Sequence, residues 1–137
     1  MTPADFSLYL SLFLYFIAFV SQLVAYFVFK RNQSKYESLL SDFRQRGMQL
    51  DIITNFASFL GPIFNAHKIA YFVDVYHGKK IYLNRNKSVS EDANLFVKSQ
   101  PLSRISWILS LHKLNVASFT VLFLAVAISF ISNSFLK

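Results

Sequence analysis

The stretch FSLYLSLFLYFIAFVSQLVAYFVF, Phe6 to Phe29, contains no charged side chain. Its one strongly polar group is the amide of Gln22, and the remaining residues are apolar, aromatic or serine. About 20 such residues in a helix suffice to cross the hydrocarbon core of a bilayer. A helix on the surface of a soluble domain would carry a polar face, which is missing here. The stretch therefore predicts a membrane-spanning helix.

A second uncharged run follows near the other end, LNVASFTVLFLAVAISFISNSFL, from Leu114 to Leu136. Apolar residues also precede it at 105–111, but His112 and Lys113 interrupt the run. A lysine is costly at mid-bilayer and tolerated at the interface, where its ammonium can reach water. We therefore expect a second span from Leu114, with residues 105–111 at the membrane surface or in its upper layer and Trp107 as an interfacial anchor.

Composition excludes several classes of protein. Hydrophobic residues make up 54% of the 137 and charged residues 15%, below the roughly 25% charge of a soluble domain. Without cysteine, the chain can form no disulfide, thiol nucleophile or cysteine metal site. The leader MTPAD carries no Lys or Arg, and no small-residue cleavage site follows, so we expect the first span to be retained rather than cleaved as a signal peptide.

The positive charge lies between the two apolar runs. The net charge is +7, from 14 Lys and Arg against 7 Asp and Glu. By the positive-inside rule, the middle is expected in the cytoplasm and both termini outside, in a bacterial inner membrane. The expected interfacial anchors are Lys30, Arg31, Arg104, Trp107 and Lys113.

These observations predict an all-α membrane protein, with two transmembrane helices flanking a basic cytoplasmic helical segment. The first span with a short outside N-terminus occupies 1–29, the amphipathic cytoplasmic or interfacial region 30–113, and the second span with a short outside C-terminus 114–137.

The middle reads as four short helices. Ser34 and Glu37 have the spacing of a capping box at the start of the first, and Gly47 is a plausible stop. The others are expected from about Asp51 to the Gly61–Pro62 break, from about Ile63 to His77 with a stop at Gly78, and from Ser88 or Ser90 to a point before Pro101. Between the last two, NRNKS is expected to be a polar turn.

The densest mixture of aromatic and basic residues is YFVDVYHGKKIYLNRNK, Tyr71 to Lys87. Its apolar residues recur at helical spacing and a basic cluster follows, the pattern of an amphipathic helix at a membrane surface. This spacing favours docking to the anionic leaflet or to a protein partner over binding to nucleic acid. The residues expected to dock are Tyr71, Phe72, Tyr76, Lys79, Lys80, Arg85 and Lys87.

Small residues recur four apart within the spans and would let helices approach closely. The expected packing positions are Ser21, Ala25, Ala125 and Ser129. Beyond these, the three histidines lack metal-ligand spacing, and the chain has no GxSxG motif, P-loop or glycine-rich phosphate cradle. The expectation is therefore a protein without catalytic residues, metal or cofactor.

The layout resembles the bacterial universal stress protein B family: a terminal span, a basic middle and a second terminal span. SLLSDFRQRGMQL looks like that family's segment after the first span, and KIAYFVDVYHGKKIYL with EDANLF and Arg104 looks like its central segment. The resemblance implies a link to stress physiology and no catalytic residues. The Phe-rich NFASFLGPIFNAHK departs from it.

Two functions remain open. The first is a non-enzymatic accessory or regulatory subunit of a larger inner-membrane assembly. The alternative is a self-oligomerising, membrane-perturbing protein, such as a lysis or defence effector. A weaker third is a lipid-handling enzyme. The expected partners are the anionic leaflet and other membrane subunits or further copies of the chain.

Overall fold

The structure is a computed structural model, and it describes residues 2–48, 50, 52–57, 64–79, 82–84, 87–88 and 91–135. Contacts divide the chain into two compact units: a two-helix unit, Met1–Ala25 with Lys113–Lys137, and a middle unit, Tyr26–His112. The elements are α1 (Pro3–Arg31), α2 (Gln33–Gln45), α3 (Ile52–Ala57), α4 (Asn65–Tyr76), β1 (Tyr82–Asn84), β2 (Lys87–Ser88), α5 (Glu91–Lys98) and α6 (Leu102–Phe135).

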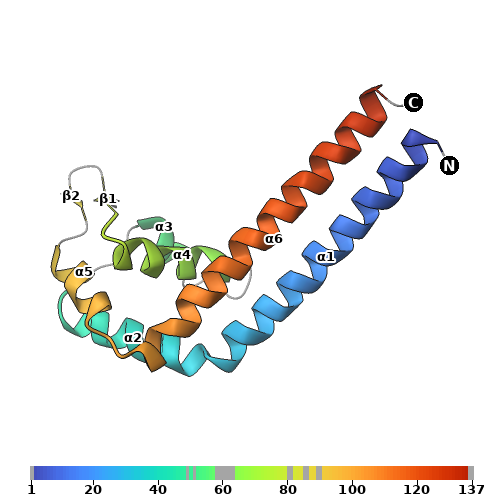
Figure 1. Cartoon of the computed structure of the whole chain (residues 1–137). Coiled ribbons are helices and arrows are strands. Elements are labelled where there is room, and N and C mark those ends of the chain that lie inside the picture. Colours follow the sequence, from blue (N-terminus) through green and yellow to red (C-terminus); the bar gives the residue numbers. More distant parts are fainter. Residues whose placement is uncertain are drawn as a thin grey trace. The chain divides into compact units, whose positions relative to one another are not determined.

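In the two-helix unit, α1 and α6 lie side by side and antiparallel, which brings the two chain ends together (Figure 1). The hydroxyl of Ser118 donates a 3.3 Å hydrogen bond to the carbonyl oxygen of Ala18, and the hydroxyls of Tyr15 and Ser129 are 3.4 Å apart. Both helices are long and apolar enough to cross a membrane. The prediction of a helical chain with two such helices is confirmed.

Helix α6 is longer than the sequence suggested, because it runs without a break from Leu102. Residues 105–111, which we expected at the membrane surface or in its upper layer, belong to this helix, and Ile105, Ile108 and Leu111 are buried within the middle unit. Their place relative to a membrane stays a prediction. The polar pair His112 and Lys113 interrupts the apolar run, but neither residue breaks a helix.

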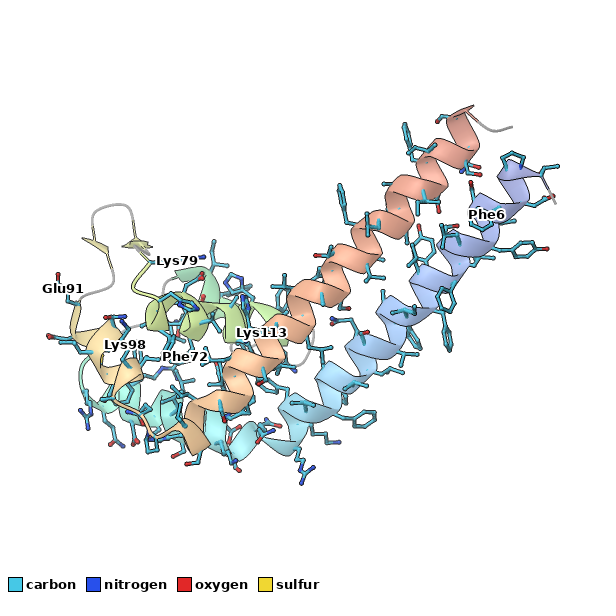
Figure 2. The ribbon with its side chains drawn as sticks, viewed as in Figure 1. Phe6, Phe72, Lys79, Glu91, Lys98 and Lys113 are labelled. Atoms are coloured by element: carbon cyan, nitrogen blue, oxygen red, sulfur yellow. The ribbon has the colours of Figure 1, made fainter. Side chains whose placement is uncertain are left out.

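Aromatic rings form the interior of the middle unit, and Phe43 of α2 lies at its centre. Its ring centroid is 5.6 Å from that of Phe72, 5.9 Å from Phe96 and 6.3 Å from Tyr71, with edge-on or tilted geometry. Such pairs add to the free energy gained by burying their area. Helices α2, α4 and α5 are therefore held together by aromatic packing, with Phe72 inside and Lys79, Glu91 and Lys98 outside (Figure 2).

Two glycines end helices where the sequence predicted. Gly47 after α2 and Gly78 after α4 have φ of +80° and +73°, a conformation that residues with a Cβ adopt at a cost. The predicted capping box is wrong, since α2 begins at Gln33 and Ser34 is already inside it. Only Asn32 separates the two helices, and its side-chain amide donates a 2.8 Å hydrogen bond back to Val28 of α1.

A small antiparallel ladder departs from the expected polar turn. Strands β1 and β2 pair through Tyr82 with Ser88 and Asn84 with Lys87. The expected break at Gly61–Pro62 lies outside the described residues. The rest of the described chain is helical or turn, so the ladder is a minor addition to a helical fold.

Candidate functional site

The outer sides of α1 and α6 carry a continuous set of large apolar side chains (Figure 2). The exposed residues include Phe13, Phe16 and Phe19 on α1 and Phe119, Phe123 and Phe130 on α6. Within the most apolar part of each helix, 17% of the residues are buried. Monomeric soluble proteins rarely expose an apolar surface of this extent. Chemically, this surface suits acyl chains.

The facing sides of the same two helices are lined by small residues. Ser11, Ala18 and Ala25 are buried at seven-residue intervals on α1, and Ser118 and Ala125 are buried at the same interval on α6. An interval of seven returns to one side of a helix every two turns, as in coiled coils. Small residues there let two backbones approach closely.

The residues predicted to pack the spans fall on or beside this seam. Ala25 and Ala125 are buried, while Ser21 and Ser129 are half-buried. Ser11, Ala18 and Ser118 were missed, because the search used an interval of four residues. The seven-residue interval from position 11 to 25 was present in the sequence and could have revealed them.

Two amides lie among the apolar residues of the two-helix unit. Asn115 is buried, about one turn from Ser118, and Gln22 is about one turn from Ala18. The Nε2 atom of Gln22 is buried and has no hydrogen-bond partner among the described residues. An unpaired amide is costly in an apolar environment, so Gln22 is a position at which a polar partner would add stability.

The residues predicted to dock divide between the interior and the surface. Tyr71 and Phe72 are 4% and 1% exposed. The apolar stripe of α4 that we assigned to a leaflet or partner therefore packs inside the middle unit, with Phe72 against Phe43 and Tyr36. Tyr76 is half-buried, and Lys79 is exposed with its Nζ 3.4 Å from Asp74 Oδ1. Lys80 and Arg85 lie outside the described residues, and Lys87 falls in β2.

Among the predicted anchors, Arg104 is the most constrained. Its guanidinium donates hydrogen bonds of 2.7 Å to Asp42, 2.9 Å to Ser38 and 2.8 Å to Gln100. The carbonyl of Arg104 accepts a 2.8 Å bond from the indole of Trp107. In this structure Arg104 joins α6 to α2, a contact that its charge alone did not indicate.

The other anchors are less constrained. Lys30 and Arg31 are exposed at the last turn of α1, where cations favour the negative helix end. The Nζ of Lys30 lies 6.0 Å from the ring centroid of Tyr26, and Lys113 is exposed on α6. The ring of Trp107 packs edge-on against Phe29, with centroids 6.0 Å apart. The interfacial roles of Lys30, Arg31, Trp107 and Lys113 remain predictions.

Two titratable groups are buried in the middle unit. Burial raises the pKa of the Tyr36 hydroxyl, which has no hydrogen-bond partner in the described part of the chain. Burial also lowers the pKa of Lys68, whose Nζ lies 3.4 Å from Asn65 Oδ1 and 5.6 Å from the ring centroid of Phe29. Both groups pack against aromatic rings, Tyr36 against Phe29 and Phe72 and Lys68 against Phe29.

The surface of the middle unit has a hollow of about 710 Å³ between the turn that follows α2 and helix α5. Its polar lining includes Arg46, Asp92 and Ser99, and Arg46 lies 4.8 Å from the ring centroid of Phe96. Within the described ranges no three His, Asp or Glu side chains group as metal ligands, and His67 Nε2 instead lies 2.9 Å from Thr54 Oγ1. The hollow thus offers mixed charge without a recognisable catalytic pair.

Comparisons with protein families, with curated proteins and with solved structures find no match for this chain. The surfaces described above are therefore the basis for proposing a function. The exposed apolar sides of α1 and α6 are the most extensive of these.

Proposed function

We propose that this chain is a small, non-enzymatic integral membrane protein in which α1 and α6 cross the bilayer. The exposed apolar surface of the two helices carries this proposal. Water would be a poor solvent for that surface, whereas acyl chains contact it without cost. The small residues on the facing sides support it too, since close backbone approach is a common way for helices to associate in lipid.

The distribution of charge supports one orientation of the chain in the membrane. Residues 26–112 hold twelve Lys and Arg against six Asp and Glu, a net charge of +6. In a bacterial inner membrane, this excess favours a cytoplasmic middle unit and outside termini. The same charge attracts the middle unit to anionic lipid headgroups.

Within that membrane, the role we propose is an accessory or regulatory subunit of a larger assembly. A middle unit fixed to the membrane at both ends by helices is suited to present a surface to a neighbouring protein. Gln22 is half-buried and is the one strongly polar side chain of its uncharged run, so a polar residue of another span could bond its amide group. The resemblance to universal stress protein B adds a link to stress physiology as a further proposal.

Copurification at native expression tests the subunit role. A tagged chain extracted in mild detergent should retain specific membrane proteins, and Gln22→Leu should release part of them. The exposed Thr120→Leu is the matched control on α6, because its hydroxyl already bonds the carbonyl of Val116 within the same helix. Recovery of a solitary monomer from both the parent chain and the control would contradict the subunit role.

The unpaired amide also supports the alternative, a self-oligomerising membrane-perturbing protein. Gln22 of one copy could then bond a polar group of another. Expression in cells loaded with a membrane-potential dye separates the two functions. Rapid depolarisation that Gln22→Leu abolishes would favour the alternative, and an unchanged potential would favour the subunit.

A further inference from the structure

Helix α3 exposes two large apolar residues, Ile53 and Phe56, and buries a polar one. Thr54 is 1% exposed, and its hydroxyl lies 2.9 Å from Nε2 of His67 on α4. Asn55 accepts a 2.9 Å hydrogen bond from the guanidinium of Arg44 on α2. Ile53 and Phe56, about one turn apart, are 67% and 64% exposed. A helix that faces water has the opposite pattern.

Helix α5 shows that this pattern belongs to α3 and not to the whole middle unit. On α5, Ala93, Phe96 and Val97 are buried, while Glu91, Asp92 and Lys98 are exposed. Leu95 is also 63% exposed, but it stands among those polar neighbours as a single apolar residue. Scattered residues of this kind are normal on protein surfaces and call for no partner.

We infer that Ile53 and Phe56 insert into the boundary between headgroups and acyl chains of an anionic leaflet. This inference rests on the proposed function, because α1 and α6 must cross that same bilayer. The docking role that the sequence suggested for Tyr71 and Phe72 then belongs to α3. Thr54 and Asn55 hold the helix to α4 and α2, so its apolar residues are free to enter the lipid.

Two observations favour lipid as the occupant over another protein. First, α1 and α6 each continue without a break from the two-helix unit into the middle unit, so the bilayer is always at high local concentration. Second, residues 26–112 carry a net charge of +6, and the cation Arg44 bonds α3 directly. Amphipathic segments with apolar residues beside cations bind anionic lipid surfaces.

Tryptophan quenching in full-length protein tests the inference. The native Trp107 is the only tryptophan and would be replaced by Phe, which keeps a ring against Phe29. Three variants of that background each carry one new tryptophan: Phe56→Trp on α3, Leu95→Trp on α5 and Phe16→Trp in the first span. Each is reconstituted into phosphatidylglycerol vesicles whose acyl chains are either brominated or unmodified.

The inference predicts that bromine removes much of the emission of Phe56→Trp and Phe16→Trp, and little of that of Leu95→Trp. In phosphatidylcholine the loss for Phe56→Trp should shrink several-fold, while that for Phe16→Trp stays the same. An equal loss in both lipids would overturn the role of charge. Equal losses at Phe56→Trp and Leu95→Trp would overturn the assignment to α3.

Two further outcomes separate this inference from the proposed function. If Phe16→Trp is quenched and Phe56→Trp is not, the chain spans the membrane and α3 does not dock, so only the inference fails. Protection of Phe56→Trp from aqueous iodide without quenching by bromine would indicate a covering protein surface and would also overturn it. If Phe16→Trp is not quenched, the proposed function fails, and the inference fails with it.

Discussion

The guanidinium of Arg104 lies 2.7 Å from the carboxylate of Asp42, across 62 residues of sequence. The pair joins the first turn of α6 to α2, and Ser38 and Gln100 bond the same guanidinium. An arginine expected only to mark a membrane boundary therefore also fixes the middle unit. Charge-assisted bonds with several partners are stronger and more directional than isolated surface pairs.

A double-mutant cycle measures the coupling energy between Arg104 and Asp42. Combining Arg104→Gln with Asp42→Asn should reveal a coupling energy of about 1 kcal/mol, at the upper end for partly exposed pairs. Denaturant unfolding followed by Trp107 fluorescence reports it, because the indole bonds the carbonyl of Arg104. The control cycle, Lys79→Gln with Asp74→Asn, removes an ion pair whose charged atoms are 3.4 Å apart, and its coupling energy should be nearly zero. Equal coupling in both cycles would contradict the assigned role.

Bulk added at the helix seam should separate α1 from α6. Ala125 is fully buried between small residues, so Ala125→Leu should destabilise the pair by about 1–3 kcal/mol through overpacking. Because the chain lacks cysteine, Ala18→Cys with Ser118→Cys gives a unique crosslink across the seam. Oxidative crosslinking should fall in Ala125→Leu and persist in Ala117→Leu, which changes an exposed position. Undiminished crosslinking in both would show that the seam lies elsewhere.

The buried hydroxyl of Tyr36 makes stability depend on alkaline pH. Burial raises the pKa of this hydroxyl in the folded chain, whereas in the unfolded chain it ionises near pH 10. Above pH 10 the unfolded state has fewer bound protons, so the free energy of unfolding should fall by up to about 1.4 kcal/mol per pH unit. Tyr36→Phe should remove this contribution and be neutral or stabilising at pH 7, since it deletes an unpaired buried hydroxyl.

Denaturant titrations between pH 7 and 11 provide the test for Tyr36. Tyr9→Phe, at an exposed position, is the control and should keep the alkaline loss of the parent chain. If the free energy of unfolding falls equally steeply with pH in the parent chain and in Tyr36→Phe, the hydroxyl of Tyr36 reaches water in the folded state.

Asn94 caps the carboxyl end of α4 from α5. Its side-chain amide donates hydrogen bonds of 2.7 and 3.1 Å to the carbonyls of Val75 and Tyr76. Asn94→Ala would remove both bonds, although the carbonyl of Val75 still accepts from the Gly78 N–H, and should cost about 1 kcal/mol. Gln33→Ala, which removes an exposed 3.2 Å bond to Glu37, should cost much less in the same unfolding assay. A cost for Asn94→Ala no larger than that of the control would show that the cap adds no stability.

Local chemistry made some of the fold predictable from sequence. Uncharged length identified both long helices, and Gly47 and Gly78 marked helix ends because a left-handed turn suits glycine. The same reasoning failed where the burial or pairing of a residue depends on residues far away in the sequence. The spacing of Phe72 and its neighbours on α4 fits a leaflet and a protein interior equally well, and only the positions of Phe43 and Tyr36 distinguish them. Likewise, nothing in the local sequence of Arg104 identifies Asp42 as its partner.

The candidate surfaces divide in the same way. The outward apolar surface of the spans follows from composition together with the pairing of α1 and α6, since each uncharged helix packs one side against the other and exposes the rest. The exposed pair Ile53 and Phe56 could not be predicted, because it depends on Thr54 bonding His67 of α4. A six-residue helix is too short for its periodicity to show which side faces the interior.

The sidedness of single cysteines tests the central claim, two membrane crossings, most directly. The parent chain has none, so Thr2→Cys and Ser99→Cys each give one exposed thiol, beside the first span and in the middle unit. With a membrane-impermeant maleimide, Thr2→Cys should label in intact cells and Ser99→Cys only after lysis. Labelling of both thiols from the same side of the membrane would contradict the crossing by α1 and with it the account of two crossings.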